Sequence, residues 1–225
     1  KGIITRQGIK LSQGISHLVL SAKHEAVKLT LARKTASFQD MTDSDVIKAI
    51  LSDHGIKATV DRSEVQHESL IQYNATDWDF INMRSEACGQ ILAVTPEGIS
   101  SKVPDLVQEP AVRIDNNFDI LDFNAELDGL SAFDNYVSKG WNYKSSEVEE
   151  VNVRSGAHDV SQGNMNSSDL ARSMGNGDFP VASDGMVPSS DGLNALASSV
   201  MMRKNLSRIC GQVTVKGFPS IKIGD

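Results

Sequence analysis

The chain has 225 residues, of which 40% are hydrophobic, so it can form one large domain or two small ones around hydrophobic cores. Its formal net charge is -7, and Lys and Arg are scattered along the sequence, which argues against a nucleic-acid binder. No apolar run approaches the roughly 20 residues of a membrane span, and the start lacks the apolar core of a signal peptide. The first residue is Lys and the last residues stop where a strand would continue, so we expect a fragment of a longer protein.

Short strands are predicted near the N-terminus, because β-branched residues are frequent there and helix caps are absent. Their expected ranges are 2–5, 15–22 and 27–32. Thr42 is then expected to cap a helix over residues 43–54, with Asp45 completing a weak capping box and Gly55 ending the helix.

A second helix is predicted within the run from Gln72 to Gln90. Thr76 stands where an N-cap is expected, and acidic residues in the first turn complement the helix dipole. Apolar residues recur at roughly helical spacing until Gly89, which is placed to end the helix in a left-handed conformation. We interpret the run as a structural motif, defined by Thr76, Asp77, Trp78, Asp79, Phe80 and Gly89.

These two helices fit into an αβαββ unit. A strand is predicted at residues 56–60, between the helices, and a polar connection leads from it to the second helix. After Gly89, apolar stretches at 91–94 and 99–103 flank the sequence Pro-Glu-Gly and predict a hairpin.

The second half of the chain has a different pattern. Antiparallel strands are expected between residues 111 and 153, because the crossover helices of a parallel sheet are absent there. Residues 155–190 are rich in Gly, Ser, Asn and Asp and are expected to be loop, with one helical turn at 168–174. Asp191 is expected to cap a longer helix, and residues 212–215 return to strand.

A calcium loop is the first chemical possibility. Four acidic or amide residues occupy loop positions 1, 3, 5 and 12: Asp115, Asn117, Asp119 and Glu126. The sixth position requires Gly for a sharp turn, and here it is Ile120. A turn leading into a strand is therefore the favoured interpretation.

Other catalytic and metal-binding signals are also weak. Asp77 and Asp79 would be candidates for glycoside hydrolysis, but residues two apart on a helix point to different sides. The five histidines show no zinc spacing, and no nucleophile elbow or phosphate loop is present. Cys88 and Cys210 are expected to be buried free thiols. We therefore expect no enzyme activity, with no catalytic, cofactor-binding or metal-binding residue.

Several motifs occur in an order that is typical of one family. They are VKLTLARKTASFQDMTDSDVI (Val27–Ile47), HGIKATV (His54–Val60), the run from Gln72 to Phe80, FNAELDG (Phe123–Gly129), QGNMNSSDLA (Gln162–Ala171) and GQVTVKGFPSIKIGD (Gly211–Asp225). In these motifs the chain resembles the hub domain of the VgrG (Rhs-element Vgr) spike proteins of type VI secretion. That domain is related to the baseplate hub of contractile phage tails, the late control protein D family.

The resemblance implies an α+β fold, mainly antiparallel β. It implies a tail-tube-like β-barrel hub, incomplete at both ends, in residues 1–40 and 106–225, and a small α/β insertion in residues 41–105. Its implied function is structural: a homotrimer joins a hexameric tail-tube protein to the needle and helps to deliver effectors. Baseplate proteins and a spike-tip protein are further implied partners, without nucleic acid, cofactor or stable membrane insertion. The implied location is the bacterial cytoplasm during assembly, followed by secretion or injection into a target cell.

Two other classes of function stay open at this point. A carbohydrate or cell-wall binding module would use exposed aromatic residues as stacking surfaces, for which the candidates are Trp78, Trp141 and Tyr143. A glycoside hydrolase would need a pocket with convergent carboxylates.

Overall fold

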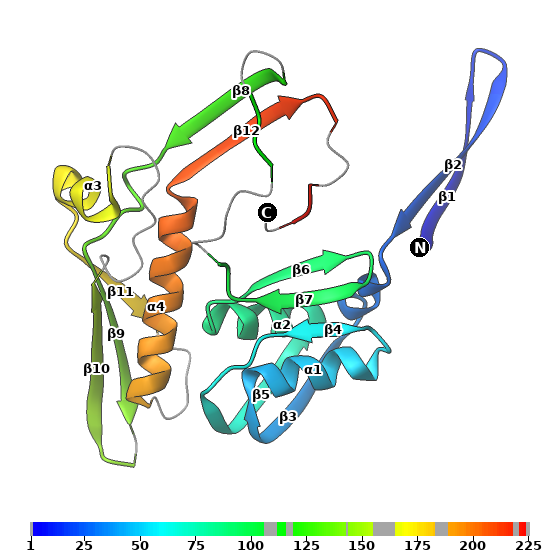
Figure 1. The fold of residues 1–225 in the computed structure, drawn as a ribbon. Helices are drawn as coiled ribbons and strands as arrows, with labels where there is room; N and C mark the ends of the chain where they lie inside the picture. The colour runs from blue at the N-terminus through cyan, green and yellow to red at the C-terminus, as the bar shows by residue number, and fades with distance from the viewer. Residues whose placement is uncertain are drawn as a thin grey trace. The chain divides into compact units, whose positions relative to one another are not determined.

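The computed structural model describes residues 2–105, 112–115, 119–142, 144–154, 165–182, 189–217 and 221–223. The chain divides into two compact units (Figure 1). Unit 1 comprises Lys1–Ser85 and Ile91–Lys102, and unit 2 comprises Glu86–Gln90 and Val103–Asp225.

Unit 1 contains three small sheets and two α-helices. Its elements are β1 (Ile3–Ser12), β2 (Ile15–Lys23), the 3-10 helix η1 (Glu25–Thr30), β3 (Arg33–Thr42), α1 (Asp43–Asp53), β4 (Ala58–Val60), β5 (Gln66–Thr76), α2 (Asp77–Ala87), β6 (Ile91–Thr95) and β7 (Gly98–Lys102). β1 pairs with β2, β3 pairs with β5, and the third sheet has the order β4-β7-β6.

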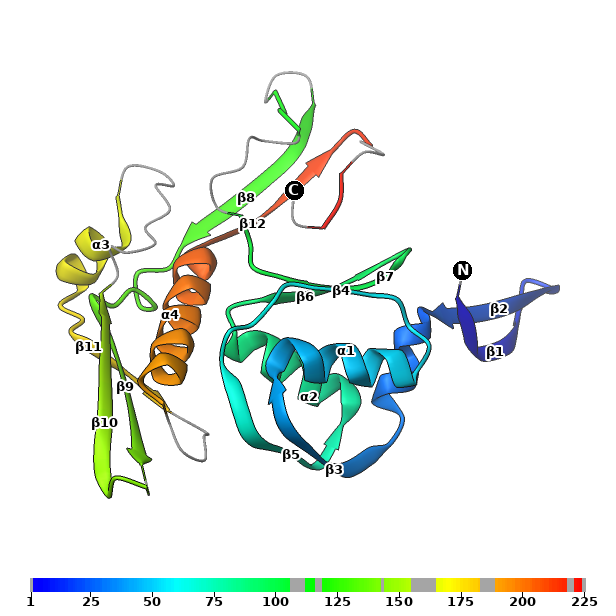
Figure 2. The same cartoon turned by 60° about the horizontal axis from the view of Figure 1, so that its bottom comes forward.

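The core of unit 1 forms where α1 and α2 lie between the β3–β5 pair and the three-stranded sheet (Figure 2). One face of α1 is buried completely, through Val46, Ile47, Ile50 and Leu51. Phe80 of α2 stacks on Phe38 of β3, with the ring centroids 5.8 Å apart. Burial of these apolar side chains is the main force that holds the helices between the sheets.

The N-terminus of α1 shows why the helix starts at residue 43. The Thr42 hydroxyl accepts a hydrogen bond from the Asp45 amide and donates one to Asp45 Oδ2 at 2.7 Å. At the other end, Gly55 has φ +66° and the Ile56 amide bonds to the Leu51 carbonyl. The predicted helix and its capping are therefore confirmed.

The β6–β7 hairpin is also confirmed, and its turn requires glycine. Gly98 has φ +151°, and a Cβ atom there would collide with the Lys57 carbonyl. The close approach of Lys57 arises because β7 pairs in parallel with β4, with Ile99 opposite Ala58.

The N-terminal predictions were partly wrong. Residues 27–32 were expected to form a strand, but η1 occupies this region and buries Ala26 and Leu29 in the core. The His24 Nδ1 atom accepts the Ala26 amide and so caps the 3-10 helix. Strand β5 was missed, because its polar sequence resembles a connection.

Unit 2 combines a mixed sheet, two helices and a separate strand pair. Its elements are β8 (Ile120–Leu127), β9 (Asn135–Asn142), β10 (Glu147–Arg154), α3 (Ser167–Met174), β11 (Asp178–Ala182), α4 (Ser190–Ser207) and β12 (Ile209–Val215). The order β10-β9-β11 defines one sheet, and β12 pairs with β8.

The core of unit 2 lies between α4 and the β10-β9-β11 sheet. Tyr136, Val153 and Val181 of the sheet are buried together with Ala197 and Met201 of α4. Three aromatic rings extend this core, since Phe133 and Phe179 lie 4.8 Å apart and both approach Tyr136. The ammonium of Lys204 lies 4.3 Å from the Phe179 ring centroid, a cation–π contact at the edge of the core.

In unit 2 the helix at 168–174 and the antiparallel pairing of β9 with β10 are confirmed. The expected cap of α4 was wrong by two residues: the Ser189 hydroxyl accepts the Gly192 amide at 3.0 Å, which places Asp191 in the first turn. β11 is parallel to β9, with Asp178 opposite Asn135. This parallel pairing is possible because the intervening chain, which includes α3, provides the crossover.

The α+β class with mainly antiparallel strands is confirmed. The described strands form two- and three-stranded sheets and do not close into a barrel. Among the helices of the described residues, none is both long and apolar enough to cross a membrane.

Candidate assembly surfaces

Asp77, the first acid of the predicted motif, is a buried structural residue. Its Oδ1 atom lies 3.0 Å from Lys34 Nζ and accepts a hydrogen bond from Gln72 Nε2 at 3.0 Å, and its Oδ2 atom lies 2.7 Å from His54 Nε2. Burial raises the pKa of Asp77, but these hydrogen bonds and the charge of Lys34 outweigh it and leave the pKa below its ordinary value. The carboxylate therefore joins β3, β5, α2 and the end of α1.

The other motif residues are arranged around the start of α2. The Thr76 hydroxyl accepts the Asp79 amide at 3.1 Å, and the Asp79 side chain is exposed. Trp78 packs partly buried against the core, and Gly89 has φ +70°. Because Asp77 is buried and Asp79 is exposed, the two carboxylates do not converge on one site.

A second buried carboxylate, Asp43, was not singled out by sequence reasoning. Arg84 Nε lies 2.5 Å from Asp43 Oδ1, and His67 Nε2 lies 2.8 Å from Oδ2. Burial raises the pKa of Asp43, but the bonds from His67 and Arg84 leave it below its ordinary value. These partners are 24 and 41 residues away in sequence, so no local motif could have indicated them.

The residues considered for other sites are placed apart or only partly described. No group of three His, Cys, Asp or Glu side chains in the described ranges could hold a metal ion. Glu126 lies on β8, whereas Asn117 of the considered calcium loop falls outside the described residues. Cys210 is exposed and Cys88 is only half-buried, so the expectation of two buried thiols was wrong. Trp141 is 58% exposed, and Tyr143 lies outside the described residues.

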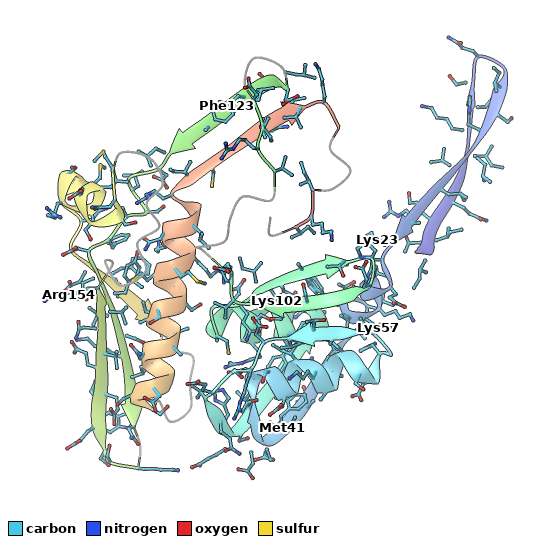
Figure 3. The ribbon with its side chains drawn as sticks, viewed as in Figure 1. Lys23, Met41, Lys57, Lys102, Phe123 and Arg154 are labelled. Carbon is cyan, nitrogen blue, oxygen red and sulfur yellow. The ribbon has the colours of Figure 1, made fainter. Side chains whose placement is uncertain are left out.

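The β1–β2 ribbon is the first candidate assembly surface. Every residue of both strands is exposed, and side chains stand out from both faces (Figure 3). Ile9 is 81% exposed and lies opposite Leu18, which is 67% exposed. An isolated two-stranded hairpin is at best marginally stable in water, and exposed apolar patches mark interaction sites. The ribbon therefore has the properties of a surface that another protein surface covers.

The β8–β12 ribbon is the second candidate assembly surface. Phe123, labelled in Figure 3, is 66% exposed and lies opposite Val213, which is 43% exposed. Leu127 at the end of β8 is 50% exposed. Within the described residues each ribbon has only two strands, so the outer edge of each strand lacks a neighbouring strand.

The sequence contained a signal for both ribbons. Apolar and polar residues alternate at positions 9–12 of β1 and 121–124 of β8, as is typical of strands with one buried face. Strands were expected at residues 15–22 and between residues 111 and 153, but most of β1 was missed because only residues 2–5 were expected to be strand. The alternation could also not show that the apolar faces stay uncovered within one chain.

Comparison with solved structures defines the class of fold. The chain is similar to a tail protein from Neisseria meningitidis, with a TM-score of 0.65 and 18% identity over 96% of this chain and 64% of that one. A 43 kDa tail protein of prophage MuSo2 from Shewanella oneidensis gives a TM-score of 0.66 and 12% identity over 99% and 65% of the two chains. Prophage tail protein gp18 from Listeria monocytogenes gives 0.55 and 11% identity over 87% and 58%. The fold is that of phage tail proteins.

The family is given by sequence. The model described as "Alg8 N-terminal domain" matches residues 1–225, so the chain belongs to this family. No curated protein matches the sequence. The chain spans slightly less than two thirds of the length of the first two tail proteins.

Proposed function

We propose that the chain is a structural component of a contractile injection machine, the hub of a VgrG-like cell-puncturing spike that joins the tail tube to the needle. The observation that carries this proposal is the pair of exposed ribbons on a phage-tail fold. The ordered VgrG-like motifs in the sequence support it independently. The buried position of Asp77 and its separation from Asp79 favour a structural role for both acids.

The proposed mechanism is mechanical. A hub of this kind matches a trimer to a hexameric tube by presenting two similar surfaces per subunit, and exposed apolar faces of strands suit this task because a partner surface can cover them. Among the described residues, each copy of the chain offers the apolar faces of the β1–β2 and β8–β12 ribbons for this purpose, while the strand edges stay available to neighbouring copies. Force from the contracting machine would then pass through hydrogen-bonded sheets, without bond chemistry in this chain.

The proposed partners follow from this role. They are two further copies of the same protein, a hexameric tail-tube protein, baseplate proteins, a spike-tip protein and effectors. The protein would assemble in the bacterial cytoplasm and leave the cell when the machine fires. We propose the domain boundaries that were expected from the sequence. The α/β insertion comprises residues 41–105, and the barrel-like hub comprises residues 1–40 and 106–225.

Mass measurement by light scattering tests the proposal, with the full chain alone and mixed with the tail-tube protein of the same machine. We expect a complex with the tube protein that is lost in the variant Ile9→Asp/Leu18→Asp. Leu130→Asp is the matched control, because Leu130 is 73% exposed and lies outside both ribbons. The proposal would be contradicted if the chain formed no complex with the tube protein, or if Leu130→Asp abolished the complex as well.

A further inference from the structure

The two ribbons carry opposite charges. β1 and β2 contain Arg6, Lys10 and Lys23 and no acidic residue. β8 and β12 contain Asp122 and Glu126 and no Lys or Arg. All these charged side chains are exposed, so they are available to a partner surface.

The register of β1–β2 places the basic residues of the ribbon on one face. Side chains alternate between the two faces of a strand, and cross-strand partners share a face. The pairs Ile9 with Leu18 and Leu11 with Ser16 therefore lie on one face, which Leu20 also joins. Lys10 and its partner His17 lie on the opposite face, together with Arg6, Ile15 and Val19.

The same separation occurs in β8–β12. The pairs Phe123 with Val213 and Leu127 with Ile209 lie on one face of the ribbon. Asp122 with Thr214 and Glu126 with Cys210 lie on the other. In each ribbon one face is thus uncharged and mainly apolar, and the other face carries the charges.

We propose that the β1–β2 ribbon of one copy pairs edge to edge with the β8–β12 ribbon of a second copy. In such a sheet the apolar faces lie on one side, and on the other Arg6 and Lys10 lie beside Asp122 and Glu126. The edges can pair because, among the described strands, neither ribbon has a third one. Opposite charges in neighbouring strands favour this partner over a like ribbon.

A second copy is the occupant that cyclic symmetry requires. A ring of three copies cannot use one self-complementary surface, because each contact must join two different surfaces of neighbouring subunits. A basic ribbon and an acidic ribbon on the same chain are such a pair. This inference rests on the proposed function only in requiring a ring of copies, and not in requiring the tube protein.

Charge reversal tests the pairing without the tube protein. We expect Arg6→Glu/Lys10→Glu and Asp122→Lys/Glu126→Lys each to weaken self-association of the full chain about tenfold, measured by sedimentation velocity. A mixture of the two variants should associate again, because the signs are complementary. Lys48→Glu and Glu147→Lys reverse exposed charges outside both ribbons and should leave association unchanged. Wild type that stays monomeric at about 100 µM, or no rescue in the mixture, would overturn the proposal.

Cysteine cross-linking identifies which chain supplies the partner ribbon. In a Cys88→Ala/Cys210→Ala background, one protein carries Lys10→Cys and another Glu126→Cys. A bismaleimide should join the two proteins when they are mixed, whereas Lys48→Cys should not replace Lys10→Cys. A third protein carries both Lys10→Cys and Glu126→Cys. If the bismaleimide joined the two cysteines only within single chains of this protein, the ribbons would pair within one chain and the proposal would be overturned. Circular dichroism spectra that match wild type establish that each variant is folded.

Discussion

Replacing Arg84 by Met is expected to destabilise unit 1, because it removes a guanidinium donor from the buried carboxylate of Asp43. Arg84 Nε lies 2.5 Å from Asp43 Oδ1, and Asp43 is 2% exposed. A hydrogen bond to a charged group contributes about 1.5–3 kcal/mol, and loss of one partner of a buried ion pair costs about 3–5 kcal/mol. His67 keeps its own bond to Oδ2, so we expect a loss of about 3 kcal/mol in the free energy of unfolding.

Urea unfolding followed by Trp78 fluorescence measures this loss. The chain has two tryptophans, so Trp141→Phe leaves Trp78, which packs against the core of unit 1, as the single reporter. With a slope of about 1.5 kcal/mol per molar urea, the unfolding midpoint should fall by about 2 M.

Two controls make this result specific. Lys48→Met on the exposed side of α1 should change the free energy of unfolding by less than about 0.5 kcal/mol. Asp43→Asn with Arg84→Met should cost less than the sum of the single changes, because each removes the same interaction. A loss below about 1 kcal/mol for Arg84→Met, or strictly additive effects, would refute the reasoning.

Three further changes have defined expectations. Unit 1 should lose stability as the pH falls below about 4, because the lowered pKa of Asp77 stabilises the folded state only while its carboxyl is ionised; Asp77→Asn should flatten this loss in urea titrations at each pH. Burial raises the pKa of Tyr136 to about 12, so unit 2 should lose stability between pH 10 and this value, and Tyr136→Phe should remove that slope in alkaline unfolding curves. Gly98→Ala should lower the free energy of unfolding by more than about 2 kcal/mol, because its Cβ would meet the Lys57 carbonyl, whereas Gly55→Ala, with open space around it, should cost about 1 kcal/mol in the same assay.

The elements with local signals were predictable from the sequence. The start of α1 depends on Thr42 and Asp45, and the β6–β7 turn depends on Gly98, so short segments contain the determining residues. The strand predicted at residues 27–32 was wrong because the prediction relied on the β-branched residues of this segment. The burial of Ala26 and Leu29, which favours η1, depends on the tertiary core and has no local signal.

The non-local features could not be predicted. Asp43 meets Arg84 and His67 only after β3, β5 and the helices are packed, and the residues do not form a spaced motif. The exposure of the ribbons could not be predicted either. Alternation indicates which face of a strand is apolar, but whether the same chain covers that face depends on the arrangement of distant segments.

The parallel pairing of β11 with β9 has a consequence for synthesis of the protein. Asp178 lies opposite Asn135, so 178 − 135 = 43 residues must be added before the first of these pairs can form. At roughly 5–20 residues per second, β9 emerges several seconds before β11 can cover its second edge. During translation, β9 is thus one of the strands of unit 2 whose open edge a chaperone would protect from wrong pairing with a neighbouring nascent chain.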